Sequence, residues 1–216
     1  MTKKPLLDMF GTDLLTSVSK TESTASVLKD KDLVLLYFSA SWCPPCKQFT
    51  PMLISFYESV CKESNTEIIL VSSDSTVEDF NGYFGIMPWK SLPATNSAAI
   101  KQKIADSLKI AGIPTLIVLD SNGDFISDTA RNDVAAAGDD EEKQKALIQK
   151  WKETKAVPIS EAELSSTGPQ NIVIRGLLML MKNPTYIIGL LYMFNKLMEK
   201  IKEMRADTGV ENGGEL

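Results

Sequence analysis

Three apolar runs set the architecture that the chain predicts. Residues 33–38 and 67–71 are nearly continuous apolar segments, as expected of strands that are buried on both faces of a sheet. Residues 115–119 form a third such run. The turn signal at residues 120–124, followed by the short apolar segment 125–127, predicts a hairpin at the end of the sheet.

Amphipathic segments with apolar residues every three or four positions lie between and after these runs. Pro51 lies inside the first of them and is expected to kink it. Residues 14–18 add a short strand near the N-terminus. Strands that alternate with helices, followed by a hairpin and a last helix, predict an α/β sandwich. The predicted helices span residues 44–62, 75–84, 98–110 and 139–154.

Composition removes several classes of function. The 216-residue chain carries a formal net charge of −5 and a pI of about 4.9, so it has no basic footprint for nucleic acid. It contains no histidine, which excludes Ser-His-Asp and Cys-His catalysis and His-Glu-x-x-His zinc sites. Three cysteines are too few for a disulfide scaffold, and their odd number fits a reducing compartment. Residues 1–19 show no signal-peptide core, so a cytoplasmic location is expected.

A Cys-x-x-Cys pair follows the first apolar run directly, at the expected junction of a strand and a helix. This order places Cys43 at a helix N-terminus, where unpaired N–H groups and the helix dipole favour an anion such as a thiolate. Pro44 and Pro45 suit the first helical turn and carry no N–H. The first free amide after Cys43 therefore belongs to Cys46.

The same spacing could in principle belong to a zinc site, which needs four ligands. Cys61 is the single further cysteine, so an intrachain zinc site would require carboxylates as well. We therefore predict a thiol–disulfide pair, Cys43 and Cys46, with no metal and no organic cofactor. Cys61 is expected to be a helix residue without a redox role.

Several short segments before, within and after the pair occur in a fixed order: residues 37–41, Trp42-Cys43-Pro44-Pro45-Cys46, residues 49–51, 87–89 and 113–115. In this order they resemble the tryparedoxin and nucleoredoxin branch of the thioredoxin superfamily, over roughly residues 10–155. The resemblance implies a thioredoxin-like, three-layer α/β/α sandwich with a mixed central sheet, and protein-disulfide reduction as the activity.

The resemblance also implies roles for single residues. Cys43 would attack the partner disulfide and Cys46 would resolve the mixed disulfide. Pro114 would be a cis proline that faces the pair, and the backbone of Ile113 would pair with the substrate. Arg131 resembles a tryparedoxin arginine that contacts substrate.

Four further residues carry weaker expectations. Trp42, beside the pair, is expected to shield the sulfur and to offer a flat apolar contact to a partner. Trp89 is either an anchor of the apolar loop or a second partner contact. Thioredoxins proper carry a buried aspartate where this chain has Tyr37, so the proton acceptor of Cys46 is not identified. Asp74 is expected to cap the following helix, with help in proton transfer near the pair as the alternative.

The function that follows is a protein-disulfide reductase. Its electrons would come from a low-molecular-weight thiol, such as trypanothione or glutathione, or from a reductase, and would pass to protein disulfides such as those of peroxiredoxins. The alternative is a non-enzymatic regulator that binds clients through Trp42, Trp89 and Pro114 and uses the cysteines as a redox switch.

The C-terminal part of the chain differs from the redox domain expected at residues 1–155. Residues 156–171 read as a polar linker and residues 172–216 as a hydrophobic, amphipathic helical tail. The apolar positions in residues 172–205 suit a membrane-spanning tail anchor, an amphipathic hairpin on a membrane surface, or packing on a partner or on the domain itself. A tail-anchored or peripheral position on an organelle membrane is therefore the alternative to a purely cytoplasmic one.

Overall fold

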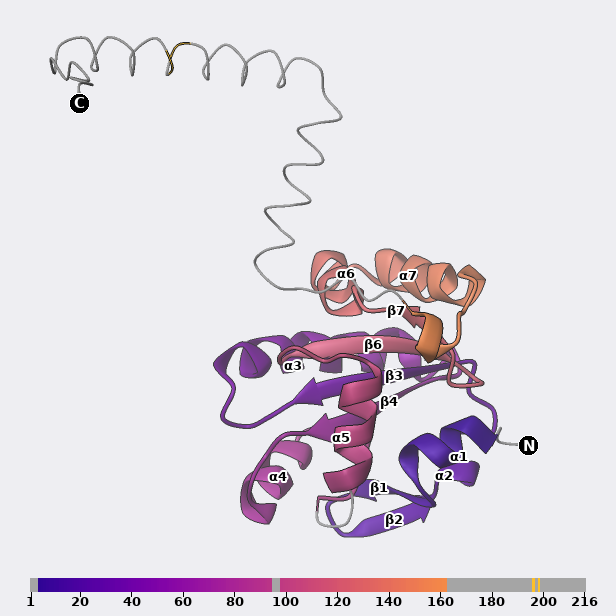
Figure 1. Cartoon of the computed structure of the whole chain (residues 1–216), viewed down its shortest axis with the longest axis vertical. Helices are drawn as coiled ribbons and strands as arrows, with labels where there is room; N and C mark the ends of the chain where they lie inside the picture. Colours follow the sequence, from indigo (N-terminus) through magenta and orange to yellow (C-terminus); the bar gives the residue numbers. More distant parts are fainter. Residues whose placement is uncertain (1–3, 95–97, 163–195, 197, 199–216) are drawn as a thin grey trace, which may run out of the picture. The chain divides into compact units, whose positions relative to one another are not determined.

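The computed structural model of the chain describes residues 4–94, 98–162, 196 and 198 (Figure 1). The chain divides into two units, Met1–Ser165 and Ser166–Leu216, and the account below concerns the first of them. The predicted tail, residues 172–216, lies outside the described residues except for residues 196 and 198. Of the predicted linker, residues 156–162 are described: Val157 forms a β-bridge with Phe125, and Ala162 is buried in a hydrophobic core of the domain. Among the described residues, no helix is both long enough and apolar enough to cross a membrane.

A mixed sheet of seven strands forms the centre of the described part of the chain, in the order β2-β1-β5-β4-β3-β6-β7. β3 runs parallel to β4 and antiparallel to β6, so the expected mixed sheet is confirmed. The strands are β1 (Asp13–Ser17), β2 (Lys20–Ser23), β3 (Leu33–Ser39), β4 (Thr66–Ser72), β5 (Lys90–Ser91), β6 (Thr115–Asp120) and β7 (Phe125–Ser127).

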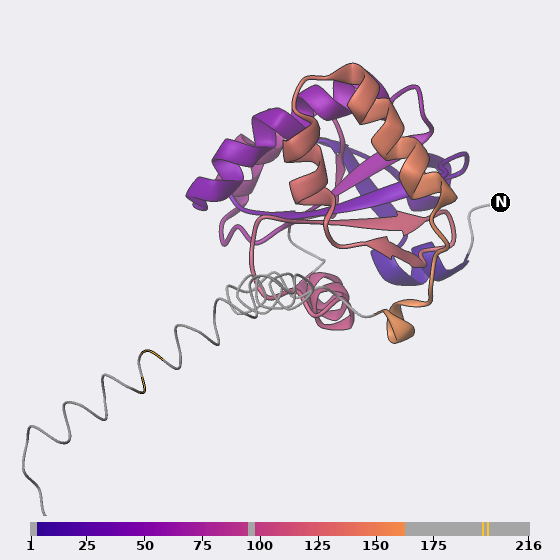
Figure 2. The same cartoon turned by 90° about the horizontal axis from the view of Figure 1, so that it is seen from above.

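Helices cover both faces of this sheet, which makes the three layers of the expected thioredoxin-like sandwich (Figures 1 and 2). α3, η1, α4, α6 and α7 pack on one face, and α1, α2 and α5 on the other. The helices are α1 (Lys4–Phe10), α2 (Thr24–Val27), α3 (Pro44–Phe56), the π-helix η1 (Tyr57–Cys61), α4 (Val77–Phe84), α5 (Ala98–Ser107), α6 (Ala130–Ala137), α7 (Glu141–Glu153) and the 3₁₀ turn η2 (Ile159–Glu161).

The central strand β3 feeds both hydrophobic cores because successive side chains point to opposite faces. Leu33, Leu35 and Tyr37 belong to the core under α3 and α7. Val34, Leu36 and Phe38 belong to the core under α1 and α5, the face seen below the sheet in Figure 2. A strand buried on both faces needs no alternation of polar residues, which explains its continuous apolar run.

The main strands and helices agree with the prediction, whereas the N-terminal region and α6 do not. The short strand expected at residues 14–18 is confirmed as β1, but residues 1–30 also contain α1, β2 and α2, which were not predicted. α3 continues through Pro51 and passes into η1. α6 was missed because its sequence, Ala-Arg-Asn-Asp-Val-Ala-Ala-Ala, has few large apolar residues. It packs against α3, α7 and β6, and these contacts stabilise it.

Candidate functional site

Cys43 is the N-cap residue of α3, just beyond the end of β3. Its backbone is extended, and its amide donates to the carbonyl of Ala40 at 3.2 Å. Pro44 and Pro45 occupy the first helical turn and have no N–H. The amide of Cys46 donates to the Cys43 Sγ at 3.3 Å, as the two prolines predict. The sulfur thus takes the place that a serine or aspartate oxygen takes at ordinary helix N-termini.

Cys43 and Cys46 are joined by a disulfide bond. Both residues are buried, Cys43 with 4% of its surface exposed and Cys46 with none. The Ile113–Pro114 bond is cis, and the Ile113 carbonyl oxygen lies 3.9 Å from the Cys43 Sγ. The turn that carries Cys43 and the loop that carries Pro114 therefore lie in contact, as the resemblance implies. The described residues hold no cluster of three or more potential metal ligands.

A second loop, after β4, fixes the turn that leads into the pair. Asp74 accepts the amide of Ser41 at 2.8 Å, and the indole Nε1 of Trp42 donates to the carbonyl of Ser73 at 3.3 Å. The expected capping role of Asp74 is wrong, because Thr76 is the N-cap of α4. Asp74 instead ties the turn before Cys43 to the neighbouring strand.

The three side chains that were predicted to contact substrate differ in their exposure to solvent. Trp42 is 59% exposed beside the disulfide, so it can be reached by a partner. Trp89 is fully buried and makes edge contacts with Tyr37 and Tyr57. A fully buried indole offers no surface to a partner, so the contact predicted for Trp89 is corrected to a core anchor. Arg131 is exposed on α6, and its contact with substrate stays a prediction.

Four buried hydroxyl groups, which we call the hydroxyl cluster, lie behind Cys46 and were not recognised in the sequence. Tyr37 Oη lies 2.9 Å from Thr50 Oγ1, and Tyr83 Oη lies 2.6 Å from the same atom. Ser39 Oγ completes the cluster at 2.8 Å from Tyr83 Oη. Thr50 Oγ1 donates to the carbonyl of Cys46 at 2.9 Å. Burial raises the pKa of Tyr37 above its ordinary value, so Tyr37 stays neutral and is not the missing proton acceptor.

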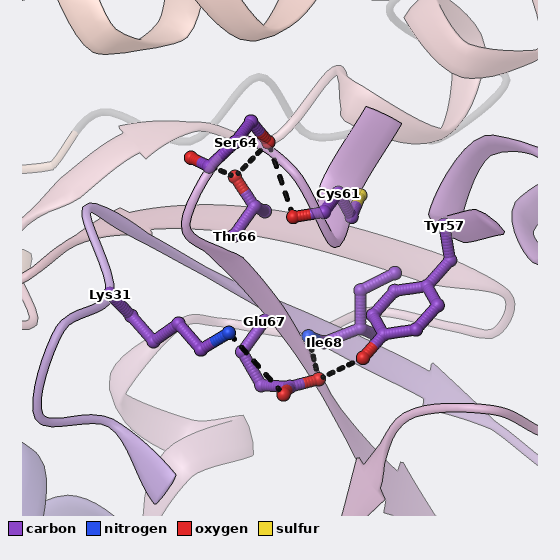
Figure 3. Close-up of polar contacts among 7 residues, drawn as sticks. All are labelled: Lys31, Tyr57, Cys61, Ser64, Thr66, Glu67 and Ile68. Carbon is purple, nitrogen blue, oxygen red and sulfur yellow. Dashed lines mark hydrogen bonds and ion pairs between the residues drawn. The ribbon is translucent and has the colours of Figure 1, made fainter. Parts of the chain in front are cut away.

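A buried carboxylate lies at the other end of the sheet (Figure 3). Glu67 is the second residue of β4, and its Oε1 accepts from Tyr57 Oη and from the amide of Ile68, both at 3.0 Å. Lys31 Nζ lies 3.9 Å from Glu67 Oε2. Glu67 pairs with Val34 near the start of β3, whereas Cys43 follows the end of that strand. This carboxylate therefore belongs to the structural core and not to the redox site.

Glu67 should make folding stability depend on pH. Burial raises the pKa of its carboxyl above the ordinary value, and Lys90 and Lys31 oppose this shift. The folded chain thus holds a proton that the unfolded chain, with a carboxyl pKa of about 4.3, has lost. Wild-type stability should fall as pH rises from about 4.3, by at most about 1.4 kcal/mol per pH unit. Glu67→Gln should remove this slope, as measured by chemical unfolding at several pH values.

The matched control for that measurement is Glu63→Gln, since Glu63 is an exposed carboxylate close by in the sequence. Its unfolding free energy should follow the wild-type pH dependence. Parallel curves for wild type and Glu67→Gln would show that Glu67 takes up no extra proton on folding.

Cys61 should be unreactive in the folded protein. It is the free cysteine of the chain and is fully buried at the end of η1. Burial and the nearby Glu67 raise the pKa of its thiol, so little thiolate forms at neutral pH. After reduction, Cys43 should react fastest with iodoacetamide in the native state, and Cys61 should react only in denaturant, as followed by mass spectrometry. Three thiols that are alkylated at similar native rates would contradict this.

Comparison with known proteins finds relatives that are all thioredoxin-like. A family model described as thioredoxin-like matches residues 30–125. Tryparedoxin from Trypanosoma brucei brucei is 42% identical over 102 residues, which cover 47% of this chain and 70% of that protein. Nucleoredoxin from Homo sapiens is 38% identical over 133 residues, which cover 61% of this chain. The chain spans 30% of the length of that nucleoredoxin.

Solved structures give the same picture. Tryparedoxin II from C. fasciculata superimposes with a TM-score of 0.58 and 34% identity, covering 62% of this chain and 92% of that one. Tryparedoxin II has also been solved in complex with glutathionylspermidine, and this structure matches with a TM-score of 0.57, 34% identity and the same coverage.

Proposed function

Because the chain belongs to the tryparedoxin family of thioredoxin-like oxidoreductases, we propose that it reduces protein disulfides by cycling Cys43 and Cys46 between dithiol and disulfide. The observation that supports this most directly is the disulfide itself. Its Cys43 sulfur caps a helix N-terminus and lies against the loop of Pro114. A bond that serves architecture alone has no need of a helix terminus that favours the thiolate.

The proposed reaction has two exchange steps. The Cys43 thiolate attacks one sulfur of a partner disulfide, so that a Cys43–partner bond forms and the second partner sulfur leaves as a thiolate. Cys46 then loses its proton and attacks the Cys43 sulfur. This step forms the intramolecular disulfide and releases the other partner sulfur as a thiolate, which takes up a proton. The partner gains two electrons. An external dithiol, or two molecules of a monothiol, later returns two electrons to the pair and is itself oxidised to a disulfide.

The electron donor is proposed to be a small thiol. Glutathionylspermidine in the tryparedoxin II complex supports this class, and trypanothione and glutathione share its cysteine thiol chemistry. A reductase protein is the remaining donor. Peroxiredoxin disulfides are proposed as physiological substrates, in line with the family resemblance.

Turnover distinguishes the proposed reductase from a redox-sensitive binding regulator. The full chain would be incubated with insulin as the protein disulfide and with excess trypanothione, glutathione or a thioredoxin reductase system, each supplied alone. A reductase should release many equivalents of reduced insulin per chain with at least one donor. One equivalent or less with every donor would favour the regulator.

A separate proposal concerns location. We propose that residues 172–205 attach an otherwise cytoplasmic chain to a membrane, on the basis of their apolar, amphipathic sequence. The full chain should sediment with membranes in cell extracts, whereas residues 1–165 should stay in the supernatant and keep their redox activity. A full-length chain that is wholly in the supernatant without detergent would contradict membrane attachment.

A further inference from the structure

We propose that Thr50 is a positioning residue for both exchange steps, because its hydroxyl, held by the rest of the hydroxyl cluster, fixes the Cys46 peptide against the Cys43 sulfur. The inference rests on the redox pair and not on the substrate or donor proposed above. Thr50 itself touches neither sulfur in the described contacts and acts through Cys46.

The hydrogen bonds of the hydroxyl cluster can run in one direction that satisfies every group. The carbonyl of Cys46 accepts and cannot donate, so the single hydroxyl proton of Thr50 goes to it at 2.9 Å. With Thr50 as the donor to Cys46, Thr50 Oγ1 accepts from both Tyr37 and Tyr83. Tyr37 Oη also lies 3.5 Å from the same Cys46 carbonyl oxygen, as a second and longer contact. Tyr83, having donated, accepts from Ser39. Hydrogen bonds that are aligned in this way polarise one another, which strengthens the bond at the Cys46 end.

The Cys46 peptide needs this support because the backbone around it offers few hydrogen bonds. Pro44 and Pro45 have no amide N–H, so the Cys46 N–H is the one donor to the Cys43 Sγ among the described contacts. Pro51 also lacks an N–H and cannot bond to the carbonyl one turn earlier in α3, that of Lys47. The first turns of α3 are thus short of backbone hydrogen bonds, and the Thr50 hydroxyl adds one at Cys46.

Both exchange steps depend on where this peptide lies. In the first step the Cys46 N–H stabilises the Cys43 thiolate before it attacks. In the second step the Cys46 sulfur must approach the Cys43 sulfur in line with the bond that breaks. A Cys46 peptide that is free to shift should weaken the first interaction and misalign the second.

Thr50→Val tests the proposal, since valine keeps the branched shape and removes the hydroxyl. The reduced full chain would be mixed with the chromogenic disulfide of thionitrobenzoate. Cys43 attack releases the first thionitrobenzoate, and Cys46 attack on the mixed disulfide releases the second. The second phase should slow about fivefold, the factor that the loss of one buried hydrogen bond of ordinary strength gives. The pH midpoint of Cys43 alkylation should rise by about 0.5 unit.

Two variants separate positioning from a general loss of stability. Thr50→Ser keeps the hydroxyl and should restore both the second phase and the midpoint to near wild type. Tyr57→Phe removes a buried tyrosine hydroxyl bond at the far end of the sheet, to Glu67. It should lower the unfolding free energy and leave both thiol readouts unchanged. If Thr50→Val does not fold, Tyr83→Phe removes one donor to Thr50 and should shift both readouts in the same direction.

Wild-type kinetics and midpoint in folded Thr50→Val, or in Tyr83→Phe in its place, would overturn the proposal. An equal slowing of the second phase in Tyr57→Phe would also overturn it, by showing that any loss of core stability has this effect. The small chromogenic disulfide needs no protein partner and no donor. The effect of Thr50→Val on the two thiol readouts could therefore still be interpreted if the proposed reductase function proved wrong.

Discussion

Cys43→Ser should abolish the reduction of insulin, whereas Cys46→Ser should stop the reaction after its first step. The reason lies in the unequal positions of the two sulfurs. Cys43 caps α3 and lies at the loop of Pro114, while Cys46 is completely buried behind it. A serine hydroxyl at position 43 is hardly ionised at neutral pH and cannot attack a disulfide, so turnover should fall below detection.

In Cys46→Ser the Cys43 thiolate still attacks, but no second thiol is present to release the partner. A mixed disulfide should accumulate, visible as a covalent adduct in non-reducing electrophoresis and released by added dithiol. Cys61→Ala serves as the matched control, because Cys61 is buried in a different part of the core. It should turn over like wild type. Turnover retained by Cys43→Ser, or an adduct formed through Cys61, would contradict the assignment.

Trp89→Ala should lower the unfolding free energy by about 3–5 kcal/mol, the range for removing a large aromatic side chain from a core. Trp89 is fully buried, and its ring meets the edges or faces of Tyr37 and Tyr57 at centroid distances of 6.0 and 5.8 Å. Its removal leaves a cavity in the core between the sheet and α3 that these rings cannot close. Chemical unfolding followed by circular dichroism measures the loss.

Trp42→Ala is the contrasting variant, because its indole is mostly exposed next to Cys43. It should change the unfolding free energy by less than about 1 kcal/mol and should raise the KM for a protein disulfide. Trp89→Phe should cost less than Trp89→Ala, since it keeps a ring and removes an indole N–H that has no acceptor among the described residues. A stable Trp89→Ala would show that the loop holds without its anchor.

The parts of the fold that were predictable from sequence are those that local chemistry decides. β3 and β4 are buried on both faces, and a continuous apolar run is the direct result. The Cys46 amide reaches the Cys43 sulfur because two prolines leave no nearer donor. Neither conclusion depends on which distant segments pack nearby.

The parts that failed depend on such distant segments. A tryptophan in an apolar loop can point inward or outward, and Trp89 points inward because Tyr37 and Tyr57 form its pocket. Thr50 looks like an ordinary helix residue until Tyr37 from β3 and Tyr83 from α4 are placed beside it. A polar residue one turn after Cys46, on an otherwise apolar helix face, was the available signal for it.

The exposure of Trp42 gives the chain a built-in optical probe of its redox face. Of its three tryptophans, Trp89 and Trp151 are buried and Trp42 is exposed. An aqueous quencher such as iodide should therefore quench the fluorescence of Trp42 and have little effect on that of Trp89 and Trp151. A protein docked over Cys43 would shield that indole and recover its emission. Binding could then be followed with unlabelled protein and both cysteines intact.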